Sequence, residues 1–203
     1  MKKSCLLTLG IVLALVAVTG SVVYFHFKNQ FDPVYHGKRI YTWKDQAIWD
    51  EDPAAREEAV QVLLEAVEEM EGEPRTQLLL RFVLHVRPNE EKPVLPKEVL
   101  PFLIRAMKVE DRSGYPAKAL YQIPGPETAT ALIDVLRSKE SSQTRYQAAY
   151  VLGALAMENK LGSAMEQAVA ALRKASQDED PKVRREAADH LKWIEARGKR
   201  TTP

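Results

Sequence analysis

The sequence has almost no cysteine, no excess of charge of either sign and few glycines. Cys5 is the only cysteine, so a disulfide within the chain is impossible and cysteine use does not indicate the redox compartment. Lys and Arg number 29 against 28 Asp and Glu, so no net field draws the protein to phosphate backbones, which argues against nucleic-acid binding. The turn glycines stand alone, so the chain has no phosphate-binding loop.

Side chains that carry chemistry are too scattered to suggest a catalytic or metal site. The four histidines follow no metal-ligand spacing: His26, His36, His85 and His190. The carboxylate pairs Asp50 with Asp52 and Asp178 with Asp180 fit helix caps better than acid–base partners, because each pair precedes a proline and a helical pattern. We therefore expect no enzymatic activity, no catalytic, cofactor-binding or metal site, and no small-molecule substrate.

One long apolar segment stands near the N-terminus. The run Cys5–Phe27 has no charged residue and, at ~1.5 Å per helical residue, is long enough to cross a bilayer. A cleaved signal peptide has a shorter apolar core of ~7–15 residues. Aromatic residues beside Lys28 are typical of a membrane interface. The sequence predicts an uncleaved signal anchor and transmembrane helix over 1–28, followed by a juxtamembrane linker over 29–41.

The charges around this segment predict its orientation. Lys2 and Lys3 favour a cytoplasmic N-terminus, which places the following domain outside the cytoplasm. Small residues near Gly20 also fit a signal-peptide cleavage site, in which case the domain would be secreted. We expect a single-pass membrane protein with an extracytoplasmic domain, and keep cleavage with secretion as the alternative.

The chain also contains an internal repeat. Asp50–Ala59 and Asp178–Ala187 share the pattern D-E-D-P-x-x-R-x-E-A, and each has a leucine seven residues after the arginine. A looser copy covers Arg145–Leu152, and a degenerate one covers Ser113–Leu120. An acidic residue followed by proline is suited to cap and begin a helix. The arginine is suited to bond the acidic turn before it and so to hold neighbouring repeats together.

Apolar stripes at helical spacing predict helices and almost no strands. The expected helices cover 42–49, 53–71, 74–87, 96–109, 113–123, 126–138, 142–157, 161–177 and 180–197. They predict an all-α repeat domain over 42–197, followed by a flexible basic tail over 198–203. The repeat spacing is irregular between Leu63 and Pro96, so the phase of the repeats is left open there.

The pattern P-x-x-R-x-x-A followed by leucine resembles HEAT repeats, from about Trp43 to Ile194. It is also similar to the related repeats of phycobilin lyases. The segment Tyr35–Trp43 resembles a lead-in, Y-x-G-[KR]-x-[IL]-x-x-W, that precedes such repeats in some bacterial envelope proteins. The resemblance implies an α-solenoid of about four helix pairs that serves as a membrane-tethered scaffold for protein–protein interaction at the cell envelope. A HEAT-fold enzyme or assembly factor resembling a phycobilin lyase is the alternative.

The repeat alignment further predicts a stripe of partner-binding residues on the second helix of each pair. The residue after each repeat arginine and the one four positions later are expected to point outward. The predicted stripe consists of Glu57, Gln61, Lys118, Tyr146, Tyr150, Arg185 and Asp189. Two tyrosines stand at its middle, and tyrosine is enriched among interface anchors. The alternative is that both rings cover the apolar surface of the neighbouring repeat.

Overall fold

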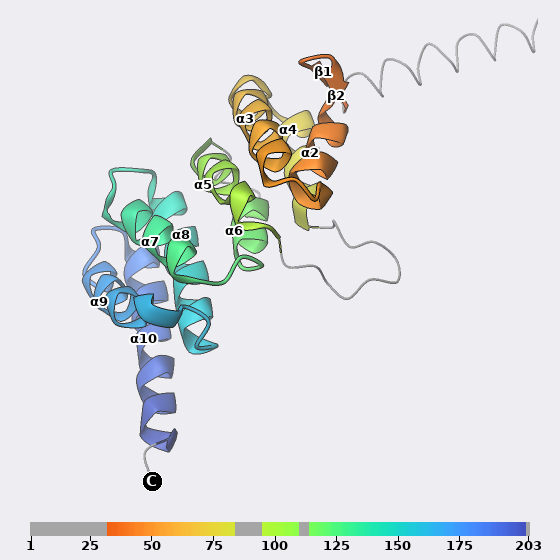
Figure 1. Cartoon of the computed structure of the whole chain (residues 1–203). Coiled ribbons are helices and arrows are strands. Elements are labelled where there is room, and N and C mark those ends of the chain that lie inside the picture. Colours follow the sequence, from red (N-terminus) through yellow and green to blue (C-terminus); the bar gives the residue numbers. More distant parts are fainter. Residues whose placement is uncertain (1–31, 84–94, 110–113, 202–203) are drawn as a thin grey trace, which may run out of the picture.

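The computed structural model describes residues 32–83, 95–109 and 114–201 (Figure 1). In these ranges the chain forms helices and one short two-stranded ribbon. The elements are β1 (Val34–Tyr35), β2 (Lys38–Arg39), α2 (Ile40–Trp49), α3 (Pro53–Glu69), α4 (Glu73–Val83), η1 (Lys97–Val99), α5 (Leu100–Val109), α6 (Tyr115–Leu120), α7 (Pro126–Arg137), α8 (Ser142–Met157), η2 (Gly162–Ala164), α9 (Met165–Ala175) and α10 (Pro181–Thr201). The predicted all-α repeat fold is confirmed, and α10 continues past residue 197 into the stretch expected to be a flexible tail.

The predicted anchor over 1–28 lies outside the described residues. Within the ranges that are described, no helix is both long and apolar enough to cross a membrane.

The helices lie in two rows. Successive helices alternate between a row of α3, α5, α7 and α9 and a row of α2, α4, α6, α8 and α10 (Figure 1). The core fills the space between the rows, and the small and large residues of the repeat pattern lie in it: Ala59, Leu63, Ala148, Leu152, Ala187 and Leu191. Alanine allows close approach of helices while leucine fills the seam, so these six positions carry the packing that the repeat predicts.

The helix starts follow the predicted capping. The side chain of Asp52 accepts a hydrogen bond from the amide of Ala54 at 3.0 Å, and Pro53 is the first residue of α3. The side chain of Asp180 accepts from the amide of Lys182 at 2.8 Å, and Pro181 is the first residue of α10. Both carboxylates satisfy amides that have no partner within the helix.

The position of α3 corrects the predicted stacking. The repeat alignment grouped α3 with α6, α8 and α10, but α3 packs along α5 in the opposite row. The reason is that α4 is itself one of the stacked helices. It packs against α6 and buries Leu78, Leu79 and Phe82. Because each added helix moves the chain to the other row, α4 shifts the phase of everything before it.

A β-ribbon was not expected in the segment before the first helix. Val34 pairs with Arg39 and Tyr35 with Lys38, across a turn in which His36 and Gly37 have φ of 45° and 77°. Two consecutive positive φ values are the requirement of a tight hairpin turn, and glycine meets it without strain. The indole nitrogen of Trp43 donates to the carbonyl of Tyr35 at 2.7 Å, so the two ends of the lead-in motif contact each other.

The repeat arginines link successive turns. Arg145 donates through Nη1 to the carbonyl of Glu140 in the turn before its helix, at 2.7 Å. Its Nε and Nη2 each donate to a carboxylate oxygen of Asp178, in the turn of the next repeat, at 2.9 Å. The preceding turn therefore supplies carbonyl groups, and the carboxylate comes from the following turn. The sequence had predicted only the link to the preceding turn.

The same link recurs, with one difference, on α3 and α10. Arg56 donates to the carbonyl of Asp50 at 2.8 Å and to the carboxylate of Glu98 at 2.6 Å. Arg184 donates to the carbonyls of Asp178 and Glu179 at 2.7 and 2.8 Å, but it has no carboxylate partner among the described residues. We call this set of contacts by Arg56, Arg145 and Arg184 the arginine ladder.

The ladder is electrostatically significant where it is buried. Burial acts to raise the pKa of Asp178, but hydrogen bonds from Arg145 and from the amide of Asp180 outweigh it and hold that pKa below its usual range. The hydrogen bond to Asp178 in turn raises the pKa of Arg145. The hydrogen bond from Arg56 lowers the pKa of Glu98 in the same way.

Candidate partner-binding surface

The predicted stripe is divided between the two rows. Glu57 and Gln61 are exposed on α3, in the row opposite the other five residues. Lys118 on α6, Tyr150 on α8, and Arg185 and Asp189 on α10 are exposed, whereas Tyr146 is half-buried. The seven residues therefore do not form one continuous stripe. The residues on α8 and α10 are on helices that pack directly against each other.

Tyr146 is held against α10. Burial, followed by the charge of Glu186 and the hydrogen bond to it, raises the pKa of the Tyr146 hydroxyl. The ring is partly buried against the core. Tyr146 therefore follows the packing alternative that the sequence left open.

Tyr150, one turn further along α8, has a different environment. The residue is 47% exposed, and its ring lies edge-to-face with the His190 ring, with the two centroids 6.1 Å apart. The His190 ring contacts Met157 through a nitrogen 3.2 Å from the sulfur and Glu186 through the other nitrogen at 3.1 Å. The side chain of His190, a residue of α10, thus lies between α10 and α8, next to Tyr150.

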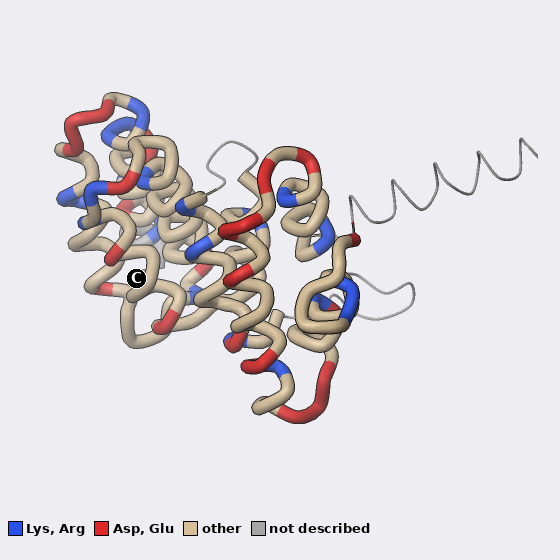
Figure 2. Tube along the Cα trace, turned by 90° about the horizontal axis from the view of Figure 1, so that it is seen from above, with Lys and Arg blue, Asp and Glu red and all other residues tan. Residues whose placement is uncertain are grey.

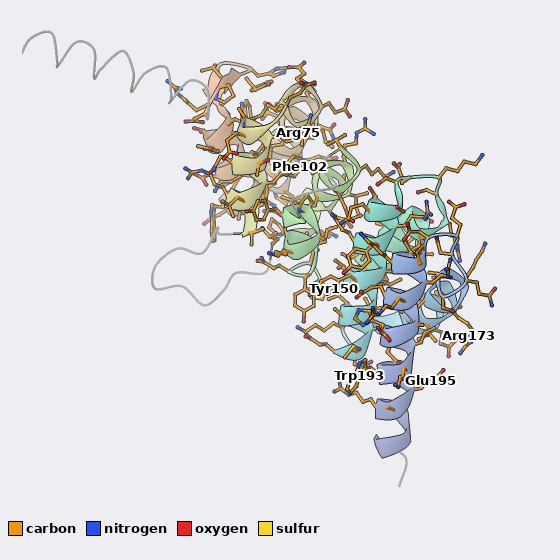
Figure 3. All side chains as sticks on the ribbon, turned by 180° about the vertical axis from the view of Figure 1, so that it is seen from behind. Arg75, Phe102, Tyr150, Arg173, Trp193 and Glu195 are labelled. Atoms are coloured by element: carbon orange, nitrogen blue, oxygen red, sulfur yellow. The ribbon has the colours of Figure 1, made fainter. Side chains whose placement is uncertain are left out.

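The aromatic surface continues onto α10. Trp193 is 60% exposed and lies one turn beyond His190. Figure 3 shows Trp193 and Tyr150 projecting on the same side of the molecule, while Arg173 of α9 lies on the other side. Large hydrophobic side chains with this exposure are rare in the described part of the chain, where only Val34, at the far end, joins these two. We call Tyr150, Met157, His190 and Trp193 the aromatic surface.

A hollow adjoins this surface at the end of α8. It encloses about 360 Å³ and is lined by Met157, Trp193, Ala196 and Arg197. The guanidinium of Arg197 donates to the carbonyl of Met157, so this cation is engaged in holding α10 to the end of α8. The lining that remains is a thioether, an indole and a methyl group, which suits an apolar side chain of a partner.

The close contact of α8 and α10 depends on Gly153. A methyl group added there would stand 2.7 Å from Cβ of His190, and still closer to the imidazole carbons. Only glycine therefore permits the distance at which Tyr150, His190 and Met157 meet. The repeat spacing did not point to Gly153, His190, Met157 or Trp193 as parts of a surface. Extending the spacing of Arg185 and Asp189 by four residues would have reached Trp193.

The structure shows no candidate metal site among the residues that it describes. No group of three histidine, cysteine or acidic side chains there could hold a metal ion. His36 is bonded to Glu65 at 2.8 Å on the surface. The side chains of Asp50 and Asp178 accept the amides of Asp52 and Asp180 at 3.0 and 2.9 Å, which agrees with capping turns.

Residues 129–203 match the sequence model of HEAT repeats. The match supports the HEAT-repeat family and covers most of α7 together with α8, α9 and α10, where helix pairs follow one another regularly. The helices before it, including α4 with its shift of phase, lie outside the matched range. No curated protein gives a significant match to the chain.

Proposed function

We propose that the chain is a membrane-tethered HEAT-repeat scaffold that binds a protein partner through the aromatic surface and performs no catalysis. HEAT repeats commonly mediate protein–protein interaction, and their stacked helices offer extended binding faces. The observation that carries the proposal is the exposure of Tyr150 and Trp193 beside the hollow at Met157. Tryptophan and tyrosine are the residues most often found at the energetic centre of an interface.

The hollow supports this proposal over that of an enzyme. Its lining has a single charged side chain, Arg197, and that side chain is already bonded to a backbone carbonyl. A catalytic pocket needs several polar groups that converge on one reacting atom. The surface is instead built like the anchor region of a protein interface, with large, exposed apolar side chains at its centre.

Replacing both Tyr150 and Trp193 with alanine is expected to reduce capture of the partner at least about tenfold, because truncating one anchor can cost ~2 kcal/mol. The partner is identified by chemical cross-linking and mass spectrometry on native membranes, with wild type and variant compared side by side. Tyr146 is left unchanged because its hydroxyl is bonded to Glu186. The control is Glu195→Ala, which changes an exposed residue on the other side of α10 from Trp193 (Figure 3). Equal capture by the double variant at an unchanged melting temperature would refute this site.

The tether is proposed from the apolar run Cys5–Phe27, with the repeat domain on the extracytoplasmic side, as in a bacterial envelope protein. The full-length chain is expected to stay in the membrane fraction after an alkaline carbonate wash, because an apolar helix of this length is not released by removing ionic contacts. Recovery of a soluble product that starts near Ser21 would show that the segment is a cleaved signal peptide.

A further inference from the structure

Among the described residues, the arginine ladder has an arginine without a carboxylate partner at one end and a carboxylate without an arginine partner at the other. At the C-terminal end, Arg184 is oriented by the carbonyls of Asp178 and Glu179 but makes no ion pair within the described ranges. At the N-terminal end, the carboxylate of Asp50 receives no arginine from any described residue. Its Oδ1 accepts the amide of Asp52 at 3.0 Å, as Asp178 accepts that of Asp180 at 2.9 Å.

The two ends of the ladder are complementary. Asp178 stands first in the sequence D-E-D-P and binds Arg145 of the preceding repeat through both carboxylate oxygens. Asp50 stands first in an identical D-E-D-P, at the start of α3. The same four residues therefore form an occupied acceptor for arginine at one end of the chain and an unoccupied one at the other.

We propose that a second copy of this chain docks head to tail, with Arg184 of one copy bound to the Asp50 turn of the next. Within the chain, the helix pair α9–α10 packs against α8. In the proposed contact, the helix pair α2–α3 of the second copy packs against α10 in the same way. The carboxylate of Glu51 then stands where Glu179 stands, 3.1 Å from Nη2 of Arg145 in the internal contact. The contact continues an interface that the chain already contains.

The facing helices remain complementary beyond the turn. In the repeat alignment, Arg185 corresponds to Tyr146, and Glu58 corresponds to Glu186. The internal contact of Tyr146 with Glu186 therefore predicts a contact of Arg185 with Glu58 of the second copy. Arg185 has an 87% exposed side chain, and Glu58 is exposed. A contact between a neutral tyrosine and a carboxylate inside the chain is thus replaced by a pair of opposite charges between copies.

The next position along α10 sets how close the copies come. In the repeat alignment, Lys192 of α10 occupies the position that Gly153 has on α8. In the proposed contact, Lys192 faces α3 of the second copy, between Glu58 and Glu65. Because a lysine cannot permit the close approach that Gly153 allows, α10 lies further from α3 of the second copy than from α8. The contact is therefore polar and carried mainly by ion pairs, so it weakens as salt is raised.

The acidic side of this contact is strongly charged. Residues 50–73 contain ten acidic residues and one basic residue. Figure 2 shows long acidic stretches of the trace in the right half of the view, whereas basic and acidic residues are mixed in the left half. Such a field accelerates the approach of a cationic surface and orients it.

A head-to-tail contact joins two different surfaces, so it produces an open chain of copies or a closed ring. The full-length protein is measured by sedimentation velocity over a range of concentrations at low and at high salt. We expect its average mass to rise with concentration and the association to weaken at high salt. A monomer at every concentration at low salt would overturn the proposal.

Charge reversal tests the contact itself. Arg184→Glu and Asp50→Arg are each expected to weaken association at least about tenfold, because each places like charges opposite each other. An equimolar mixture of the two variants is expected to associate again, since the glutamate introduced in one variant then faces the arginine introduced in the other. Association that is unchanged by either variant, or a mixture that stays monomeric, contradicts the proposed pairing.

Arg185→Glu with Glu58→Arg provides a second pair that leaves the capping turns intact, should Asp50→Arg unfold the start of α3. Each single variant is again expected to weaken association, and the mixture to restore it. Neither pair includes a residue of the aromatic surface, so partner capture through Tyr150 and Trp193 is expected to be unchanged. Association that is lost on replacing those two residues, while both charge pairs have no effect, would assign self-contact to the aromatic surface and overturn the proposal.

Discussion

Replacing Arg145 with methionine is expected to lower the free energy of unfolding by about 3 kcal/mol, because it leaves the Asp178 carboxylate without its charged partner in a nearly buried site. The side chains of Arg145 and Asp178 are only 9% and 12% exposed, and two hydrogen bonds join them. Methionine keeps most of the length and apolar contact of the arginine stem. Chemical denaturation of both proteins under identical conditions measures the difference.

The matched control for this prediction is Arg184→Met. Arg184 occupies the same place in the repeat pattern, but it is exposed and bonds only to two carbonyls. We expect its replacement to cost about 1 kcal/mol or less. Equal losses from the two variants would mean that the carboxylate of Asp178 contributes nothing to stability beyond the bonds to the turn.

The Arg145 pair also makes stability depend on pH in a defined direction. The folded protein holds the pKa of Asp178 below the value that this group has in the unfolded chain, so the unfolded chain takes up a proton first as pH falls. The contribution of Asp178 is complete above about pH 4, the usual aspartate range, and is lost as pH falls toward its lowered pKa. In Arg145→Met this loss in acid is expected to be smaller than in wild type.

Replacing Gly153 with alanine is expected to lower the free energy of unfolding by about 2 kcal/mol, because the added methyl group forces α8 and α10 apart. The methyl carbon would lie 2.7 Å from Cβ of His190, which is fixed to the backbone of α10 and cannot rotate away. Helix propensity predicts the opposite sign, since alanine stabilises a helix interior by ~1 kcal/mol relative to glycine. The sign of the measured change therefore separates the two effects.

A second background shows whether His190 is the cause. In His190→Ala the clash with the ring is removed but the 2.7 Å contact with Cβ remains, so Gly153→Ala is expected to cost less there than in the wild-type chain. The difference between the two backgrounds is a coupling free energy, which is measured with a double-mutant cycle. If Gly153→Ala stabilises the wild-type chain, α8 and α10 do not make the close contact described above.

The helices and their starts could be predicted from sequence because their signals are local. Asp52 before Pro53 and Asp180 before Pro181 act within one turn, and Leu63 and Leu191 repeat at helical spacing. The row in which α3 lies could not be predicted in the same way. It depends on whether α4 occupies a place in the array. The helix begins Glu73-Pro74-Arg75, so its proline and arginine lack the P-x-x-R spacing of the other repeats and do not reveal this.

The candidate surface was predicted only in part, for a related reason. Tyr146 and Tyr150 are one turn apart on α8 and look equivalent in the sequence. Their environments differ because Glu186 binds one and the His190 ring lies edge-to-face with the other, across a contact set by Gly153. Burial that depends on the neighbouring helix is not encoded in the periodicity of a single helix.

The alternation of helices between two rows gives the fold a rule of parity. An even number of helices between two copies of a motif puts them on opposite rows, as with the six between α3 and α10, and an odd number puts them on the same row, as with α9 between α8 and α10. Gain or loss of a helix pair thus preserves the face on which every motif is displayed. Gain or loss of one helix exchanges the faces of everything on one side of it, without changing a residue of the motifs themselves.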